Sequence, residues 1–374
     1  MKTPNRETRE IEGDSLLVGK LPRGCSLCTK GSKMVLFVTG LCNSSCYYCP
    51  LSLDKSGQDV VFADEMPVSD GTDILYEAQA IRSEGAGISG GDPLCDLERT
   101  LKYIELLKRE YGPSFHLHLY TSQTDVSAEV LNMLKTAGLD EIRFHPQTND
   151  WSGIRHALEI GMNVGLEVPA IPGRQDDLKK IAMKAEEMGV SFLNINELEA
   201  SETNFDKLVA MGMRLTNLES ASIEGSASTA REVLKWSEEG LQKLSVHFCS
   251  ARFKDSIQMR RRLERRLEQT IRSFEERDDQ EPLLILGVIR AVHGQELDHE
   301  QLTIIHTTLQ SQFDIPTDLM NIDEPRKRIE IAPWILDEIS QQLKEKLVDI
   351  KDLEIGIAFE YPTWDRLQTM FDPL

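Results

Sequence analysis

The sequence predicts an α/β protein: a full or partial (β/α) barrel followed by a small C-terminal α/β domain. Two observations support this prediction. Short apolar runs alternate with amphipathic stretches of helical length, a pattern typical of βαβ units and a parallel sheet. The alternation then breaks at a highly charged segment and resumes over residues 283–374. An open, doubly wound sheet is the alternative architecture.

Seven short apolar runs are predicted to be the barrel strands, because each has the length and side-chain content of a buried strand. These runs are Met34–Thr39, Gly85–Ser89, Phe115–Tyr120, Glu141–Phe144, Val164–Val168, Phe192–Ile195 and Leu244–Phe248. Segments with helical periodicity lie between them and are predicted to cover the sheet. These segments are Asp73–Ser83, Leu97–Tyr111, Ala128–Ala137, Trp151–Ile160, Gln175–Met188 and Thr229–Leu241. So many units within residues 34–250 favour a barrel over a doubly wound sheet.

The chain is interpreted as four consecutive parts. They are an N-terminal extension with a C-x2-C knuckle (1–33), the barrel (34–250), a charged helix with a linker (251–282) and the small domain (283–374). The small domain is expected to contain three strands and two helices. The strands are Leu283–Arg290, Arg328–Ile331 and Leu353–Phe359, and the helices are His299–Gln312 and Trp334–Leu347.

Composition narrows the class of protein. A charged fraction of 28% and a hydrophobic fraction of 40% are ordinary for a globular chain. The formal net charge of -20 argues against a surface that attracts nucleic acid as a whole, so a nucleic-acid partner is possible but not favoured. No apolar run approaches the roughly 18 residues of a membrane span, and the N-terminus has no signal-peptide pattern. We therefore expect a cytoplasmic protein.

Three cysteines in the segment Val38–Ser52, VTGLCNSSCYYCPLS, carry the clearest chemistry. Cys42, Cys46 and Cys49 are spaced C-x3-C-x2-C and directly follow the first predicted strand. Three thiolates on one short loop can bind an iron–sulfur cluster while leaving one iron without a protein ligand. A structural zinc ion would usually require four protein ligands. The pattern therefore indicates a catalytic cluster.

This cysteine spacing resembles the signature of the radical S-adenosylmethionine (SAM) superfamily, including the aromatic Tyr48 before the third cysteine. Gly90, Gly91, Asp92 and Pro93 follow the second predicted strand and resemble the family's GGEP motif, with aspartate in place of glutamate. The resemblance covers roughly residues 34–250. Within the superfamily, the chain looks most like uncharacterised archaeal proteins related to pyruvate formate-lyase activating enzyme.

The resemblance implies the cofactors and the reaction. The three cysteines would hold a redox-active [4Fe–4S] cluster, SAM would chelate the fourth iron, and the GGDP backbone would contact the SAM amino group. An external one-electron donor, such as a ferredoxin or flavodoxin, would reduce the cluster. SAM would then be cleaved to methionine and a 5′-deoxyadenosyl radical, which abstracts hydrogen from an unidentified substrate.

The sequence leaves the substrate open. A glycyl-radical protein, a nucleic acid, and a metabolite or lipid are all compatible with the resemblance. A different class of function is a non-catalytic iron–sulfur or zinc-binding protein, such as an electron carrier. That alternative explains the cysteines but not the GGDP turn after the next strand.

Polar residues near the ends of other strands are candidate SAM or substrate contacts, because barrel active sites lie at the carboxyl ends of strands. They are Thr121, Ser122, Glu167, Pro169, Asn194 and Asn196. Each is equally compatible with a capping or core-satisfying role. His145 could contact substrate or act as an acid or base near neutral pH, or serve only a structural role.

Cys25 and Cys28 form a second, C-x2-C pair, which is a half-site for zinc or for another iron–sulfur cluster. Cys249 is the expected additional ligand, with Cys95 and His247 as alternatives. The pair precedes the first strand and is expected near the opposite end of the barrel from Cys249. Cys95 and Cys249 could instead be small apolar residues.

The segment Ala251–Arg277 is predicted to be one long, highly charged helix. Its basic residues are Lys254, Arg260, Arg261, Arg262, Arg265, Arg266 and Arg272. Interleaved glutamates at 264, 268, 275 and 276 favour a solvated, ion-paired face over a phosphate-binding clamp. The C-terminal domain carries no chemical signature; covering the barrel mouth and recognising substrate are the roles considered for it.

Overall fold

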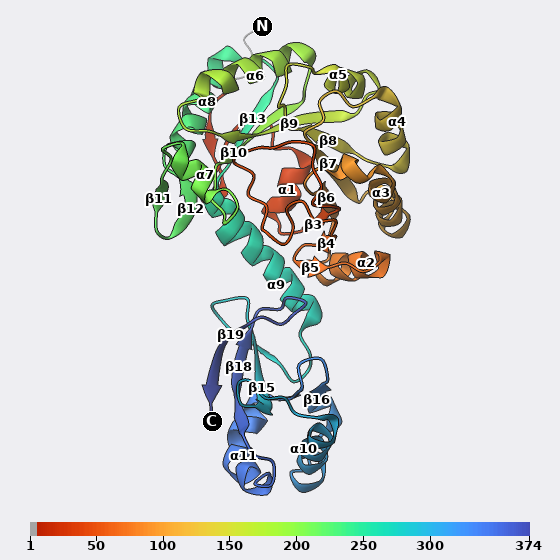
Figure 1. Cartoon of the computed structure of the whole chain (residues 1–374), viewed down its shortest axis with the longest axis vertical. Coiled ribbons are helices and arrows are strands. Elements are labelled where there is room, and N and C mark those ends of the chain that lie inside the picture. The colour runs from red at the N-terminus through yellow and green to blue at the C-terminus, as the bar shows by residue number, and fades with distance from the viewer. Residues whose placement is uncertain (1–5) are drawn as a thin grey trace. The chain divides into compact units, whose positions relative to one another are not determined.

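The computed structural model describes residues 6–374. The chain divides into two compact units, Met1–Arg262 and Leu263–Leu374, each with its own sheet and apolar core (Figure 1). No helix among the described residues is both long enough and apolar enough to cross a membrane.

The first unit is built on a curved sheet whose seven central strands are parallel (Figure 1). In spatial order they are β3 (Lys33–Phe37), β6 (Gly85–Ser89), β7 (His116–Thr121), β8 (Glu141–Phe144), β9 (Asn163–Ala170), β10 (Phe192–Glu197) and β13 (Ser245–Cys249). All seven predicted strands are present. Antiparallel strands extend both edges, so the described sheet is open and forms a partial (β/α) barrel. On the β3 side these are β4 (Phe62–Ala63) and β5 (Met66–Pro67), and on the β13 side β2 (Leu16–Val18) and β1 (Arg9–Glu10).

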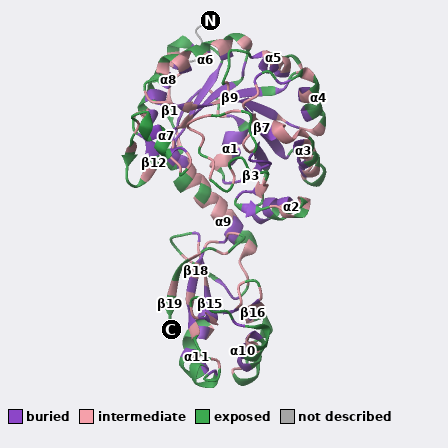
Figure 2. Cartoon of the chain, in the orientation of Figure 1, coloured by how far each residue is buried: buried purple, intermediate pink, exposed green. Residues whose placement is uncertain are grey.

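Helices pack around the outside of this sheet (Figure 1). They are α2 (Gly71–Ala80), α3 (Leu97–Tyr111), α4 (Ala128–Ala137), α5 (Ser152–Glu159), α6 (Gln175–Met188) and α8 (Ser226–Gly240). Local sequence sets their ends: Asp70 forms a capping box at the start of α2, and Gly138 ends α4 with a left-handed conformation. The central strands of this sheet are largely buried (Figure 2). Leu117, Leu119 and Ile142, for example, are fully buried. Each contributes roughly 1.5–3 kcal/mol by leaving water.

The N-terminal segment enters the barrel. Helix α1 (Arg23–Thr29) lies on the inner side of the curved sheet and contacts β3, β6 and β7 (Figure 1). Gly24 permits this close approach, because a Cβ there would lie 2.5 Å from His118 Nδ1 and 2.6 Å from Arg143 Nη2. The predicted C-x2-C knuckle is therefore a turn of helix inside the barrel.

Besides helix α1 and the short edge strands, further elements of the first unit were not predicted. A short helix, α7 (Phe205–Ala210), and a hairpin of β11 (Leu215–Asn217) and β12 (Ser220–Ile223) follow strand β10. After β13, the chain forms a π-helix over Phe253–Gln258, which continues into α9 (Met259–Thr270).

The predicted charged helix is shorter than expected. It ends at Thr270 because the backbone N–H of Arg272 donates to the Glu275 carboxylate at 2.8 Å, where a continuing helix would supply a carbonyl. Its basic residues also have acidic partners. Arg261 pairs with Glu12, and Arg262 pairs with Asp64. These basic residues are ion-paired as expected, but their partners are distant in sequence. The face is also less solvated than predicted, because Arg266 is only 4% exposed.

The second unit is a six-stranded antiparallel sheet with two helices. Its strands are β14 (Glu276–Arg277), β15 (Leu284–Ala291), β16 (Met320–Asp323), β17 (Arg328–Ile331), β18 (Leu353–Glu360) and β19 (Gln368–Pro373), and its helices are α10 (His299–Gln312) and α11 (Pro333–Lys346). The predicted strands and helices are all present, and β14, β16 and β19 are additional. The apolar core includes Ile289, Leu302 and Leu336, each fully buried.

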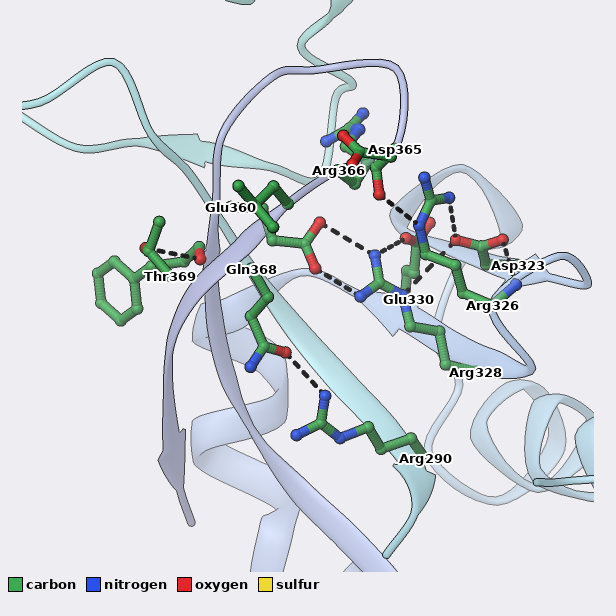
Figure 3. Close-up of polar contacts among 12 residues, drawn as sticks. Arg290, Asp323, Arg326, Arg328, Glu330, Glu360, Asp365, Arg366, Gln368 and Thr369 are labelled. Atoms are coloured by element: carbon green, nitrogen blue, oxygen red, sulfur yellow. Dashed lines mark hydrogen bonds and ion pairs between the residues drawn. The ribbon is translucent and has the colours of Figure 1, made fainter. Parts of the chain in front are cut away.

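A buried ion-pair network crosses this second sheet (Figure 3). Arg328 on β17 donates to both oxygens of Glu360 and to Glu330 at 2.7 Å, and all three side chains are almost fully buried. Arg272 also pairs with Glu330. Because every charge has an opposite partner, the cluster has the character of a structural network.

Candidate active site

A cavity of about 890 Å³ opens at the carboxyl ends of the barrel strands and extends into the barrel. The inward positions of all seven parallel strands, the cysteine loop after β3 and helix α1 contribute to its lining. All of its lining residues belong to the first unit. This is the location in which α/β barrels carry their active sites.

The three predicted cluster cysteines lie on one irregular loop that lines this cavity. All three are free thiols; Cys42 is exposed, whereas Cys46 and Cys49 are partly buried. Side chains from the segment directly before α7 hold the loop in place by hydrogen bonds to its backbone. Thr203 Oγ1 donates to the Cys49 carbonyl at 3.3 Å, and Asn204 Nδ2 donates to the Tyr48 carbonyl at 3.1 Å.

The cysteine loop fits an iron–sulfur cluster by the chemistry of its donors. It presents three thiols within eight residues to one cavity, and thiolates are the ligands such clusters use. Between residues 6 and 374, no group of three His, Cys, Asp or Glu side chains is arranged closely enough to bind a metal ion without adjustment. The loop has no helix or strand hydrogen bonds to break, so its backbone can adjust around a bound group.

The GGDP turn is bonded directly to the beginning of that loop. The backbone N–H of Gly91 donates to the Thr39 carbonyl at 2.8 Å, and that of Asp92 donates to the Leu41 carbonyl at 2.8 Å. A Cβ on Gly90 would lie 2.4 Å from the Thr39 oxygen. The two glycines are therefore required for this backbone contact, and Pro93 then begins a short 3₁₀ turn.

Asp92 is the centre of a buried hydrogen-bond network. Its carboxylate, in a residue only 1% exposed, accepts from Thr121 Oγ1, from the backbone N–H and hydroxyl of Ser122, and from the Leu94 N–H. Ser44, within the cysteine loop, donates to Ser122 Oγ at 2.9 Å. Thr121 and Ser122 therefore lie at the site as predicted, with their hydroxyls turned towards Asp92.

Tyr48 and His145 form a second connection across the cavity. His145 Nδ1 lies 2.7 Å from the Glu167 backbone carbonyl, which can only accept, so Nδ1 carries the proton. Nε2 therefore accepts from the Tyr48 hydroxyl at 2.8 Å, and that oxygen in turn accepts from Gln147 Nε2 at 2.9 Å. Burial lowers the pKa of His145, and burial raises the pKa of Tyr48, so both side chains are neutral near pH 7.

The side chains on β9 and β10 that were predicted to contact SAM form hydrogen bonds with one another. Glu167 Oε1 accepts from the side-chain amides of Asn194 and Asn196, and Glu167 Oε2 accepts from Arg143 Nη1 at 3.1 Å. His247 Nδ1 contacts the Asn194 amide oxygen. All of these side chains line the cavity, as does Pro169, which lies opposite Asn196 in the sheet.

The barrel interior is more polar than the sequence analysis anticipated. Arg143, His118 and Lys33 point inward and are almost fully buried. Both ring nitrogens of His118 lack a hydrogen-bond partner. Burial lowers the pKa of Lys33 to about 7, and its ammonium nitrogen lies 2.9 Å from His116 Nδ1. The signal was present in the strand FHLHLY, whose polar residues alternate with leucines buried against the helices.

The second set of cysteines also reaches the cavity. Cys25 and Cys28 on α1 and Cys249 at the end of β13 all contribute to its lining, contrary to the expectation that α1 and Cys249 lie at opposite ends. Cys25 Sγ lies 3.5 Å from Arg143 Nη2, and burial raises the pKa of this thiol to about 12. Cys95 is partly buried and does not contribute to the lining.

Two further cavity residues were not predicted as site residues. The π-helix after β13 directs Lys254 into the cavity, where its ammonium group pairs with Glu199 Oε2 at 2.6 Å. Single π-helical turns are rare and are concentrated at functional sites. The apolar periodicity of the sequence does not reveal such a turn, because the turn differs from the surrounding helix only in its hydrogen bonds, which run from i to i+5.

Known proteins resemble both units. The profile of the Radical SAM superfamily matches residues 36–165, and a domain of unknown function, DUF8061, matches residues 283–373. A protein of Methanocaldococcus jannaschii, provisionally named a glycyl-radical enzyme activating enzyme, is 36% identical over 367 residues, which cover 95% of this chain and 93% of the relative.

Two solved structures are also similar. SuiB of Streptococcus suis bound to SAM is 11% identical, with a TM-score of 0.42 over 60% of this chain and 52% of SuiB. Methylornithine synthase is 11% identical, with a TM-score of 0.41 over 60% of this chain and 69% of that enzyme. Neither similarity identifies the substrate of this chain. The match of the superfamily profile to the cysteine loop and the near-full-length relative confirm the family predicted from sequence: the chain belongs to the radical SAM superfamily, whose enzymes use a [4Fe–4S] cluster and SAM.

Proposed function

We propose that this radical SAM enzyme is an activating enzyme that abstracts a hydrogen atom from a glycine Cα of a partner protein. The cluster and SAM, when bound, supply a 5′-deoxyadenosyl radical by one-electron reductive cleavage of SAM. The near-full-length relative is provisionally named for this activity. The observation that carries the chemistry is the cysteine loop, bonded to the GGDP turn above the barrel cavity.

Each part of the site has a role in this proposal. Cys42, Cys46 and Cys49 would hold the cluster, with the backbone of the GGDP turn close to the SAM amino group. Asp92 would position Thr121 and Ser122 beside them. Further into the cavity, Glu167, Asn194 and Asn196 would offer polar contacts to the rest of SAM. Those side chains already bind one another, so the site would be largely formed before SAM enters.

The cluster loop has access to an electron donor. Radical SAM activating enzymes need an external donor, and we propose a ferredoxin or flavodoxin here. Cys42 is exposed, and its neighbour Leu41 is 40% exposed. The described cysteines are all free thiols, which is consistent with action in the reducing cytoplasm.

A partner protein is favoured by an apolar surface beside the cysteine loop. Phe205, Val209 and Met211, on and just after α7, are 42%, 50% and 55% exposed. Asn204, directly before this helix, bonds to the Tyr48 backbone. Apolar side chains grouped on a surface are typical of protein contact sites. Their position next to the cavity mouth suits a substrate that is itself a protein.

The first experiment tests the radical chemistry. The protein is reconstituted anaerobically with iron and sulfide, reduced with dithionite, and assayed for 5′-deoxyadenosine after addition of SAM. The triple variant Cys42→Ala, Cys46→Ala, Cys49→Ala should lose both cluster iron and product. Iron retained by the triple variant would indicate a second cluster. Intact SAM beside a reducible cluster would favour the non-catalytic metal-binding alternative, unless substrate is required for cleavage.

The second experiment tests the substrate class. Native host cells are grown with glycine deuterated at Cα, and their extract is separated into protein and small-molecule fractions. The proposal predicts that only the protein fraction delivers deuterium to 5′-deoxyadenosine and acquires a stable radical signal in electron paramagnetic resonance. Transfer from the small-molecule fraction, or no deuterium transfer beside normal SAM cleavage, would contradict the glycine assignment.

A further inference from the structure

The cavity is lined by an ion pair that has no part in the cluster loop or the GGDP turn. Glu199 follows shortly after strand β10, and Lys254 lies in the π-helix after β13. The Lys254 ammonium group donates to Glu199 Oε2 at 2.6 Å, and both side chains line the cavity. Because β10 and β13 are neighbouring parallel strands, the pair lies at the carboxyl ends of strands, where barrel active sites are found.

The pair occupies its own part of the cavity wall. The GGDP turn follows β6, whereas Glu199 and Lys254 follow β10 and β13, and strands β7, β8 and β9 lie between β6 and β10 in the sheet. The pair is nevertheless joined to the cysteine loop, because Asn204 Nδ2 donates to the carbonyls of both Glu199 and Tyr48, at 3.0 and 3.1 Å. This wall therefore borders the loop that would hold the cluster and is available to a substrate.

Both members of the pair keep hydrogen-bonding capacity that the chain does not use. Glu199 Oε1 is buried and has no hydrogen-bond partner among the described residues. The Lys254 ammonium has three N–H donors, and Glu199 Oε2 is its only described acceptor. The side chains of Glu199 and Lys254 are 21% and 29% exposed, so a group in the cavity can reach them. Since buried carboxylate oxygens are normally bonded, a bound group is expected to supply the missing donor.

The charge of the pair selects the kind of group that it binds. Ammonium and carboxylate neutralise each other, so a charged ligand would lose its hydration and gain little in return. A peptide group is neutral and carries one N–H donor and one C=O acceptor. Its N–H matches the free oxygen of Glu199, and its C=O matches the free donors of Lys254. The pair is therefore complementary to the main chain of a polypeptide.

A polypeptide has a route to this pair from the surface. Lys207 on α7 lines the cavity, whereas Phe205 and Val209 on the same helix are exposed. One short helix therefore contributes both to the cavity wall and to the apolar surface beside it. A segment of a partner protein that contacts this surface can extend over α7 into the cavity and reach Glu199.

We propose that Glu199 and Lys254 form a main-chain binding site that holds the substrate polypeptide beside its reactive glycine. A peptide group next to the glycine donates its N–H to Glu199, and its carbonyl oxygen accepts from Lys254. These contacts orient the segment so that the glycine Cα–H faces the SAM site for direct abstraction. The pair binds the substrate and takes no part in breaking a bond. The inference rests on the proposed function, because it requires a protein substrate.

The test titrates the enzyme with the Cα-deuterated protein fraction of the host extract. The reconstituted full chain is reduced, given SAM and increasing amounts of this fraction, and deuterated 5′-deoxyadenosine is measured by mass spectrometry. Lys254→Met should need about tenfold more of the fraction for half-maximal transfer, the effect of losing a hydrogen bond to a charged group. Lys254→Arg keeps the charge and the N–H donors, so it should restore most of the affinity. Cluster iron, SAM affinity and substrate-free SAM cleavage should equal those of the native protein in both variants.

Two further variants separate substrate binding from folding. The double variant Glu199→Gln, Lys254→Met has no unpaired charge and should show the same loss as Lys254→Met. Lys179→Met removes an ion pair of similar length, 2.7 Å to Glu232 between α6 and α8, and should leave the titration unchanged.

Each contrary result has a distinct meaning. Native half-saturation in Lys254→Met and in the double variant, or an equal shift in Lys179→Met, would overturn the main-chain site while the glycine assignment stands. Weaker SAM binding in Lys254→Met would assign the pair to SAM and overturn the site as well. If the native enzyme takes no deuterium from the protein fraction, the glycine assignment itself fails, and the main-chain site fails with it.

Discussion

The Asp92 carboxylate accepts two hydrogen bonds from Ser122, one from its backbone N–H at 3.0 Å and one from its hydroxyl at 2.9 Å. The same carboxylate accepts from Thr121 and from the Leu94 N–H. One short acidic side chain therefore joins the ends of β6 and β7, and through Ser44 it supports the cysteine loop. Asp92, which replaces the glutamate of the family's GGEP pattern, therefore has a structural role in this protein: its carboxylate accepts hydrogen bonds only from residues of the same chain.

Removal of this carboxylate should weaken both the fold and the site. Asp92→Ala would leave the half-buried N–H of Ser122 and the hydroxyls of Thr121 and Ser122 without their acceptor. A hydrogen bond to a charged group contributes about 1.5–3 kcal/mol, so we expect the free energy of unfolding to fall by about 3 kcal/mol or more. Urea unfolding measures this loss, and calorimetric titration of the reconstituted enzyme should show weaker SAM binding.

Asp96→Ala is the matched control for Asp92→Ala. Asp96 is also an acidic cap on the same connection, and it accepts from the Arg99 N–H at 3.0 Å, but it does not contact β7 or the cysteine loop through any described hydrogen bond. Loss of a helix cap costs about 1 kcal/mol. A similar loss of SAM affinity in both variants would mean that Asp92 has no special relation to the site.

Tyr48→Phe should have a small, local effect. The substitution removes the hydroxyl that donates to His145 and accepts from Gln147, while it retains the aromatic ring. We expect a loss of about 1 kcal/mol in unfolding free energy. Tyr47→Phe is the control, because the neighbouring ring lies only 4.9 Å away, centroid to centroid, but its hydroxyl has no described hydrogen bond. Equal losses in the two variants would contradict a role for the Tyr48–His145 contact.

Lys33 should give the barrel a distinctive pH dependence. Burial lowers its pKa from 10.5 to about 7, so the unfolded chain binds more protons between these values than the folded chain does. Its contribution to stability therefore rises as pH increases from about 7 to 10.5. The difference in unfolding free energy between the native protein and Lys33→Met should change along this slope. Lys30→Met, at a side chain 60% exposed, should show no such change; a flat difference for Lys33→Met would refute the prediction.

Glu330 should give the C-terminal unit an acid limit. Burial alone would raise its pKa, but Arg272 and Arg328 outweigh burial and lower the pKa from 4.5 to about 2. The stabilisation is therefore complete above pH ~4.5 and is lost as pH falls towards ~2. Glu330→Gln should lose stability near neutral pH and show a weaker acid dependence in urea unfolding of the full chain. Glu338→Gln, on the exposed face of α11, should behave like the native protein.

Regular secondary structure could be predicted where local signals agree. The bounds of β6, β8, α3, α4, α6 and α10 match the predicted segments. In α3, for example, apolar periodicity coincides with the Asp96 cap and with Gly112 at the C-terminus. The cluster cysteines and the GGDP turn could also be found, because their spacing and position after strands are local properties of the chain.

The missed features depend on contacts between distant segments. Helix α1 has only seven residues, and its position is set by packing of Gly24 against His118 and Arg143. Strand β2 has three residues and pairs with β13, far along the chain. Arg143 inside the barrel was not expected because an isolated buried charge is costly, yet Glu141 and Glu167 balance it.

The pairing of the first and last barrel segments sets an order of assembly during synthesis. The hydroxyls of Ser15 and Ser250 share a hydrogen bond across 235 positions of sequence. At about 5–20 residues per second, the ribosome needs roughly 12–47 s to travel between them. Throughout that interval, the thiols of Cys25 and Cys28 have no finished barrel to shield them. The edge of the sheet formed by β2 and β13 should therefore be the last part of the barrel to close.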